Sequence, residues 1–335
     1  MRNVILLIMV FMLSACEHKE LCYKHPHNVR VKVVFDWKYA PEAAPKGMCV
    51  YFYSLETDSY KRVDFNNLQG GSVDLRVGKY RVLSYNNDTE CVNFLNTGSF
   101  DNHSATTREG NVLEPILGNT VGPAPRSSGT DEEKVVISPD MMWGCSVLDV
   151  EITDDGVSYV CSPFDDNNVT DGELVENTEH IITLYPRELV CTYTYDVRNV
   201  KNMKYMQQMS GTISGMSGML TFSTEELDSE SVTIPFAAVK ADDSTITGKF
   251  YTFGHHETNA DPHKMVFYVI MNDGAKYCFK DSKQLDITDQ VDNAPNKRRV
   301  HIIIDGLDLP QPIENGDGFI PSLDDWIVEE NEIIV

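Results

Sequence analysis

The chain has 335 residues, with 28 basic and 51 acidic side chains and a formal net charge of −23 at pH 7. This acidic balance argues against a nucleic-acid partner, because binding to DNA or RNA depends on lysine and arginine contacts to phosphate. The length is enough for two domains that each bury a core, and the ordinary composition argues against a disordered chain.

The first fifteen residues have the pattern of a bacterial lipoprotein signal peptide. Arg2 makes the start positive, residues 4–12 are apolar and uncharged, and the run ends in Leu13-Ser14-Ala15-Cys16. A run of this length is too short to span a bilayer as a permanent helix. We expect cleavage between Ala15 and Cys16, with diacylglycerol and palmitate on Cys16 as the membrane anchor. A plain secretory peptide that happens to end near Cys16 is the alternative.

Residues 16–27 are expected to be a lipidated tether, and residues 28–160 a first β-sandwich. Between Val29 and Trp37 apolar and polar side chains alternate, which is typical of a strand buried on one face. Residues 96–131 are rich in Asn, Ser, Thr, Gly and Pro without a period, and this predicts a long surface loop. The expected strands of this domain are 29–37, 48–53, 73–77, 80–85, 91–95, 134–137 and 147–152.

A linker at 161–177 and a second β-sandwich at 178–310 are expected next. Asp273-Gly274 between two apolar runs is a strong signal for a β-hairpin. The tail, 311–335, is expected to pair as an edge strand or to lie loose. The fold class predicted by the sequence is therefore all-β, with two antiparallel sandwiches in tandem. The expected strands of the second domain are 180–185, 189–197, 232–239, 246–253, 265–271, 275–279 and 300–305.

The cysteines give no metal or redox motif. With Cys16 lipidated, an odd number remains, so at least one thiol is free or pairs between chains. Several lie in predicted strands, where a buried apolar cysteine is the ordinary interpretation. Cys145 and Cys161 are a candidate local disulfide. The seven remaining cysteines are Cys22, Cys49, Cys91, Cys145, Cys161, Cys191 and Cys278.

Histidines and acidic pairs are the only other patterns that suggest a bound ion. Neither histidine cluster has a carboxylate at a recognised metal-motif spacing, so we expect no metal. The acidic pairs lack the alternating spacing of a calcium loop and are expected to be solvated turns. The residues concerned are His25, His27, His255, His256 and His263, and the pairs Asp154-Asp155, Asp165-Asp166 and Asp242-Asp243.

No nucleophile elbow, phosphate loop or HExxH motif is present, so we expect no catalytic residues, no cofactor and no enzyme activity. A pair of catalytic carboxylates on a β scaffold is the alternative that 51 acidic residues leave open. A second alternative is a carbohydrate- or host-ligand-binding surface. That surface would use the aromatic side chains Trp37, Tyr51, Tyr53 and Trp143, provided they form an exposed cluster.

Several segments resemble a Bacteroidetes lipoprotein family of unknown function. They are Val31–Trp37, Gly47–Tyr53, Tyr85–Glu90, Leu184–Pro186, Asn199–Asn202, Ser214–Gly218, Thr247–Gly254 and His301–Asp305. That family is distantly similar to the FimB-like anchor lipoproteins of fimbriae, which have two transthyretin-like sandwiches. The resemblance implies a cell-envelope adhesion or fimbrial accessory protein at the outer membrane, with its periplasmic or surface face left open. It also implies pilin-like partners bound by strand donation.

Overall fold

A computed structural model of the chain describes residues 27–118, 133–161, 164–165, 168–169, 173–258, 260–280, 282–311 and 327–329. Cys16 and the predicted signal peptide lie outside these residues. The mostly β fold expected from the sequence is confirmed. Within the described ranges, the helical elements are α2 (Glu114–Leu117), α3 (Thr288–Asp292) and the 3-10 turns η1 (Met203–Tyr205) and η2 (Lys283–Leu285). None of the described helices is long and apolar enough to cross a membrane.

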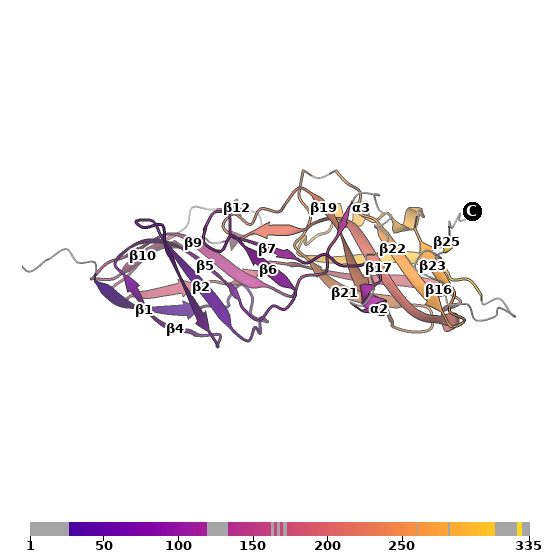
Figure 1. The fold of residues 1–335 in the computed structure, drawn as a ribbon, viewed down its shortest axis with the longest axis horizontal. Helices are drawn as coiled ribbons and strands as arrows, with labels where there is room; N and C mark the ends of the chain where they lie inside the picture. The colour runs from indigo at the N-terminus through magenta and orange to yellow at the C-terminus, as the bar shows by residue number, and fades with distance from the viewer. Residues whose placement is uncertain are drawn as a thin grey trace, which may run out of the picture.

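Two sheets at one end of the elongated molecule share a hydrophobic core (Figure 1). The smaller sheet has the order β14-β1-β4, and the larger has the order β13-β10-β9-β5-β2-β3 with β15 paired to β9. Alternation along β1 sends Val31 and Val33 into this core, where they join Val50 of β2. The strands are β1 (Asn28–Phe35), β2 (Met48–Ser54), β3 (Tyr60–Phe65), β4 (Gly70–Arg76), β5 (Gly78–Asn86), β9 (Trp143–Ile152), β10 (Val157–Cys161), β13 (Glu173–Asn177), β14 (Ile181–Leu184) and β15 (Arg187–Glu188).

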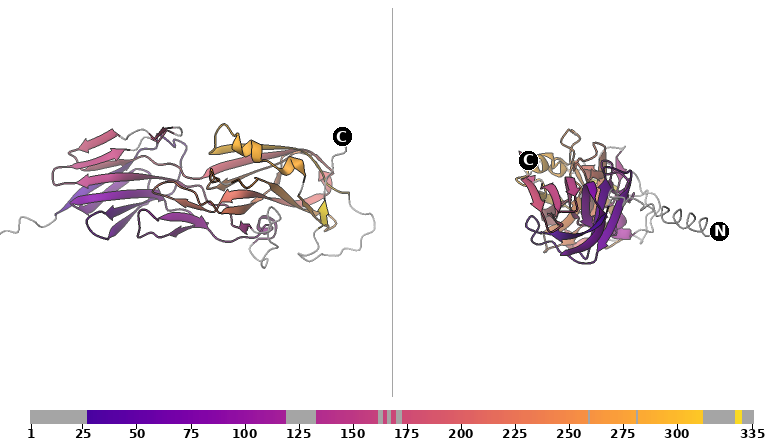
Figure 2. Two further views of the ribbon diagram at one scale, coloured as in Figure 1. Left: turned by 90° about the horizontal axis from the view of Figure 1, so that it is seen from above. Right: turned by 90° about the vertical axis from the view of Figure 1, so that its left-hand side faces the viewer.

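Two further sheets at the other end enclose a second core (Figure 2). Their orders are β20-β21-β16-β24 and β25-β23-β22-β17-β19-β8. The hairpin expected at Asp273-Gly274 joins β22 to β23, and Gly274 has the positive φ of 83° that such a turn needs. The strands are β8 (Lys134–Val135), β16 (Cys191–Lys201), β17 (Met206–Ser217), β19 (Ser231–Ala237), β20 (Val239–Lys240), β21 (Ile246–Thr252), β22 (Met265–Met271), β23 (Lys276–Phe279), β24 (Arg299–Asp308) and β25 (Ile327–Glu329).

A small sheet in the middle corrects the expected loop at 96–131. Its order is β18-β7-β6, with β6 (Val92–Leu95), β7 (Ser104–Thr107) and β18 (Met219–Thr221). The described part of the loop region also contains α2 and the buried side chain of His103. Polar strands such as Ser104–Thr107 carry no apolar alternation, so the sequence pattern missed them. Because β7 pairs with β18 from the second half of the chain, this sheet connects the two ends.

Strand pairing also moves the expected boundary at 161–177. Residues 173–177 form β13, which pairs antiparallel with β10, and β14 pairs parallel with β1. Residues that we expected in a linker and in the second domain therefore complete the first two sheets. Between β10 and β13, the two short strands β11 (Phe164–Asp165) and β12 (Asn168–Val169) pair with each other. The physical reason is that β13 runs back antiparallel along β10, so backbone hydrogen bonds hold this stretch in the same sheet.

Candidate functional site

The free edges of the sheets are the first candidate surface, because an open edge can accept a strand from another chain. Residues 327–329 of the tail form β25, which adds in parallel to the edge strand β23. Ile327, Val328 and Glu329 lie opposite Tyr277, Cys278 and Phe279. The edge of β23 is therefore able to take up a short added strand.

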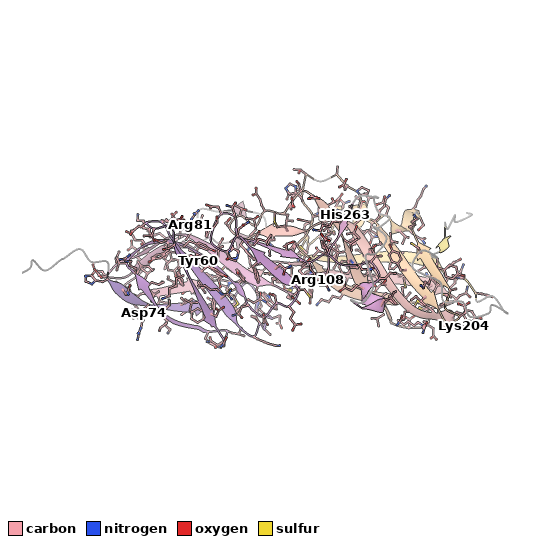
Figure 3. The ribbon with its side chains drawn as sticks, in the orientation of Figure 1. Tyr60, Asp74, Arg81, Arg108, Lys204 and His263 are labelled. Atoms are coloured by element: carbon pink, nitrogen blue, oxygen red, sulfur yellow. The ribbon has the colours of Figure 1, made fainter. Side chains whose placement is uncertain are left out.

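Another long edge of the same end is covered by side chains. β24 ends the four-stranded sheet, and Gln290 of α3 bonds both backbone groups of Ile303: Ile303 N donates to Oε1 at 2.8 Å, and Nε2 donates to the carbonyl at 2.9 Å. Gln284 donates to the carbonyl of Gly306 at 2.7 Å. These amides occupy groups that an added strand would need. At the opposite end, where Figure 3 labels Asp74 of the edge strand β4, Lys61 donates to the backbone carbonyl of Asp74 at 2.7 Å.

A cleft of about 500 Å³ lies where the two ends of the molecule meet. Its lining includes Tyr39, Trp143, Arg187, Glu188, Arg298 and Arg299. Arg187 and Arg298 both form ion pairs with Glu225, and Nη1 of Arg298 donates to the carbonyl of Glu188 at 2.8 Å. Arg299 also pairs with the Glu188 carboxylate at 2.7 Å. Because the arginines already bond protein carboxylates, the cleft works mainly as a polar junction.

A Glu225→Ala variant tests this junction. The side chains of Arg187, Glu225 and Arg298 are 13%, 14% and 29% exposed. In the variant, two mostly buried guanidinium groups lose the carboxylate with which both form an ion pair. We expect the free energy of unfolding to fall by about 2 kcal/mol in urea denaturation. Arg30→Ala removes the exposed pair with Asp74 and should cost less than about 1 kcal/mol. Equal losses in the two variants would contradict this role of Glu225.

The proposed aromatic ligand surface is not formed by the four aromatics named from the sequence. Tyr51 and Tyr53 are buried in the core between the middle sheet and the larger first sheet. Trp37 packs against the first core and donates its indole Nε1 to the carbonyl of Leu68 at 2.9 Å. Trp143 alone of the four lines the cleft. Tyr51, Tyr53 and Trp143 belong to strands and Trp37 follows β1, and the four side chains present no shared planar face.

The described cysteines are mostly buried, as the sequence interpretation favours. Cys49, Cys145, Cys191 and Cys278 are buried, and Cys91 is partly buried. Burial raises the pKa of Cys49 to about 12 and that of Cys191 to about 11, so both stay neutral thiols near pH 7. Cys22 and the side chain of Cys161 lie outside the described residues, so the Cys145–Cys161 disulfide stays a prediction.

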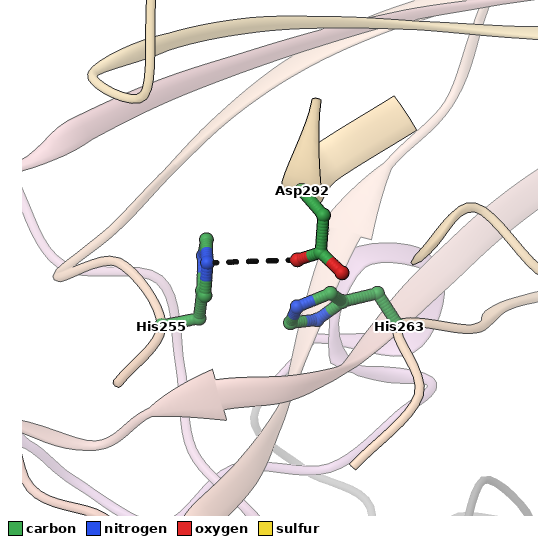
Figure 4. Close-up of side chains that lie close together, drawn as sticks. All are labelled: His255, His263 and Asp292. Atoms are coloured by element: carbon green, nitrogen blue, oxygen red, sulfur yellow. Dashed lines mark ion pairs between the residues drawn. The ribbon is translucent and has the colours of Figure 1, made fainter. Parts of the chain in front are cut away.

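Two of the predicted loop histidines come together with a carboxylate that the sequence did not single out. His255 follows β21, His263 precedes β22, and Asp292 ends α3 (Figure 4). One ligand atom from each of the three lies within 4.8 Å of the others, and His255 Nε2 is 3.8 Å from Asp292 Oδ1. Figure 3 places His263 in the C-terminal half of the molecule. His256 is not a member of this group, and His25 lies outside the described residues.

Burial sets the electrostatics of this group. Burial is the main cause that lowers the pKa of His255, and His263 and Lys297 lower it further. His263 is only 4% exposed, and its ring lies 4.9 Å from that of His255, centroid to centroid. No local sequence pattern singles out Asp292, because it is 29 positions from His263 and belongs to a helix of five residues.

Sequence comparisons with known proteins give one family and one partial relative. Residues 15–237, more than half of the chain, match the family described as Domain of unknown function (DUF5119). A candidate fimbrium anchoring subunit of Bacteroides ovatus, Fim4B, is 26% identical over 149 residues. That match spans 44% of this chain and only 40% of the relative.

Solved structures give a similar picture. The crystal structure of a candidate adhesin from Bacteroides ovatus has a TM-score of 0.54 at 18% identity, covering 92% of this chain and 95% of its own. At that identity the similarity concerns the fold alone. The fimbrial anchor protein Mfa2 of Porphyromonas gingivalis has a TM-score of 0.45 at 12% identity, over 83% of this chain and 91% of its own. On the match across residues 15–237, this chain belongs to the DUF5119 family.

Proposed function

We propose that this protein is a non-catalytic, lipid-anchored component of the cell envelope that holds a fimbrial subunit at a sheet edge. The similarity to a candidate fimbrium anchoring subunit supports the class of partner. The N-terminal apolar run that closes with Leu13-Ser14-Ala15-Cys16 supports attachment to the outer membrane through a lipid on Cys16. The observation that carries the partner surface is the pairing of β25 with β23.

In this proposal two β-sandwiches in tandem carry that edge away from the membrane. The two large hydrophobic cores support the division, because each is shared by one pair of sheets. We place the boundary after β15, in contrast to the linker expected at 161–177, because β13 and β14 pair within the first sheets. The middle sheet then stiffens the connection, since β18 of the second half pairs with β7 of the first.

Strand replacement is the binding step that this edge supports. Within the described residues β25 contributes three residues, so a partner strand that pairs along all four residues of β23 would form more backbone hydrogen bonds. The amide-covered edge of β24 offers no such opportunity at Ile303. We therefore assign the fimbrial subunit to the β23 edge, where it takes the place of β25.

Site-specific photo-crosslinking in intact cells tests this assignment. A photo-reactive residue at Lys280, directly after β23, should crosslink to a fimbrial subunit. The matched control is Ile303, which is 41% exposed on the covered edge of β24 and should give no such product. Deletion of residues 327–335 should raise the yield at Lys280 several-fold, because it removes the competing strand.

Two results would count against the proposal. One is an absence of fimbrial product at Lys280 in fimbriated cells, and the other is an equal yield at Ile303. The glycan-binding alternative has its own signature. If a glycan array shows binding that Trp143→Ala abolishes, the cleft rather than the sheet edge is the ligand site.

A further inference from the structure

We propose that His255, His263 and Asp292 bind one divalent transition-metal ion of the zinc class, with a solvent molecule completing the coordination. The two imidazoles and one carboxylate come from three separate segments, so their meeting is a product of the fold and not of a local turn (Figure 4). Two histidines with one carboxylate and an open position is an established zinc ligand set. This inference is independent of the fimbrial role.

The orientation of His263 supports a ligand role. Its Nδ1 lies 3.2 Å from the carbonyl of Ser214, and a carbonyl only accepts hydrogen bonds, so Nδ1 carries the proton. That tautomer leaves the lone pair of Nε2 available for an ion. Histidine ligands in metal sites are usually oriented in this way by a bond from the other ring nitrogen.

A glycine in a neighbouring strand and two hydrogen bonds of its own backbone hold His263 in place. Gly215 lies in a bulge of β17 with a φ of +76°, and a Cβ there would be 2.8 Å from Nδ1 of His263. Glycine therefore lets the strand approach the ring. The amide of His263 donates to Oγ1 of Thr288 at 2.9 Å, and its carbonyl accepts from the amide of Ile287 at 2.9 Å. These bonds hold His263 beside the start of α3, and α3 carries Asp292.

Only small movements separate this arrangement from a coordinated one. Ligand atoms about 2.1 Å from a tetrahedral zinc ion lie about 3.4 Å from one another. The ligand atoms here lie within 4.8 Å of one another, and the His255 to Asp292 distance is already 3.8 Å. The Asp292 side chain is 52% exposed at the end of a short helix, which gives it freedom to close on an ion and leaves a path from solvent.

The test uses the full-length lipoprotein, solubilised in detergent and stripped of metal with a chelator. We expect isothermal titration with Zn²⁺ to show one site sensitive to His255→Gln and Asp292→Asn, with affinity reduced at least 10-fold in each variant. Cobalt should give the visible absorption of a tetrahedral nitrogen and oxygen site, and both variants should lose it. Zinc should also raise the Tm of the unmodified protein but not that of His255→Gln. Both substituted side chains are partly exposed, so the variants are expected to fold.

His301→Gln is the matched control. Nε2 of His301 lies 3.6 Å from Asp196, as in the proposed site, but it belongs to no group of three ligands in the described residues. Zinc affinity should be unchanged in this variant. Zinc binding that His255→Gln and Asp292→Asn leave intact would overturn the proposal, because it would place the ion elsewhere, for example at Cys22 and His25. Absence of a site tighter than millimolar would overturn it as well.

Discussion

A Cys16→Ser variant is expected to incorporate no labelled palmitate and to disappear from the outer-membrane fraction. The sulfur atom of Cys16 would carry the diacylglycerol. A serine hydroxyl does not replace this thiol in the lipid-transfer reaction. Membrane attachment by acyl chains is worth about 0.8 kcal/mol for each buried methylene, so loss of the chains removes nearly all of the affinity. Metabolic labelling with palmitate, followed by membrane fractionation, measures both effects.

Cys22→Ser is the matched control for this experiment. Cys22 lies six positions further on, outside the Leu13-Ser14-Ala15-Cys16 pattern, so its loss should leave labelling and fractionation unchanged. Label retained in Cys16→Ser would refute lipid attachment at Cys16. The fold and the strand-edge proposal would not be affected by that result, because neither depends on residues before Asn28.

Acid is expected to destabilise the protein through His103, by about 3 kcal/mol between pH 7 and pH 4. His103 is fully buried, and burial followed by the charge of Arg62 lowers its pKa to about 4. In the unfolded chain the same group titrates near 6.5. The unfolded state therefore binds more protons between these two pKa values. The stabilisation is complete above pH 6.5 and is lost as the pH falls towards 4.

The partners of His103 explain why the neutral ring is favoured. The hydroxyl of Tyr53 donates to the carbonyl of Thr97 at 2.8 Å, so it accepts from Nδ1 of His103, which lies 2.7 Å away. Nε2 then accepts from the hydroxyl of Tyr85 at 3.1 Å. A second proton on the ring would place a positive charge where there is little solvent, and the Tyr85 hydroxyl would have to turn its hydrogen away from Nε2.

Urea denaturation at a series of pH values measures this effect, and His103→Gln is the control. Glutamine keeps one donor and one acceptor but does not titrate, so the variant should lose about 3 kcal/mol less than the unmodified protein over the same pH range. The carboxylates titrate in both proteins, so the difference between them isolates His103. Parallel pH profiles would contradict the assignment.

The sequence predicted best those strands in which one face meets a core. β1 and β16 show regular alternation, because each lies in a sheet with a single buried face, and the Asp273-Gly274 turn identified the β22–β23 hairpin. β17 was missed, although it pairs with both β19 and β22. It carries glycine and serine where large side chains pack closely against its backbone. At Gly211, for example, an added Cβ would overlap the ring of Phe236. Because small residues fill these positions, β17 lacks the alternation of apolar and polar side chains from which a strand is predicted.

The candidate sites also differ in how much of each could be predicted from contiguous residues. The cleavage site predicted at Cys16 rests on contiguous residues, which a sequence displays directly. The strand at 327–329 lies within the tail for which an edge strand was one of two expectations. The histidine group was not readable. His255 and His263 were visible as a loop cluster, but their carboxylate comes from α3, and no local pattern connects residues that meet only after β22, β23 and α3 have packed.

Local structure is therefore encoded in short stretches of this chain, such as the alternating strands and the Asp-Gly turn, and the predicted export signal is likewise a local pattern. Long-range pairing is not, because hydrogen bonds between strands are made by backbone groups that every residue carries. The tertiary structure alone shows the parallel pairing of β14 with β1, the pairing of β7 with β18 and the addition of β25 to β23, because each joins segments that are distant in the sequence. In the function proposed above, Cys16 attaches the chain to the membrane, and the packing of the sheets leaves the edge of β23 for a partner.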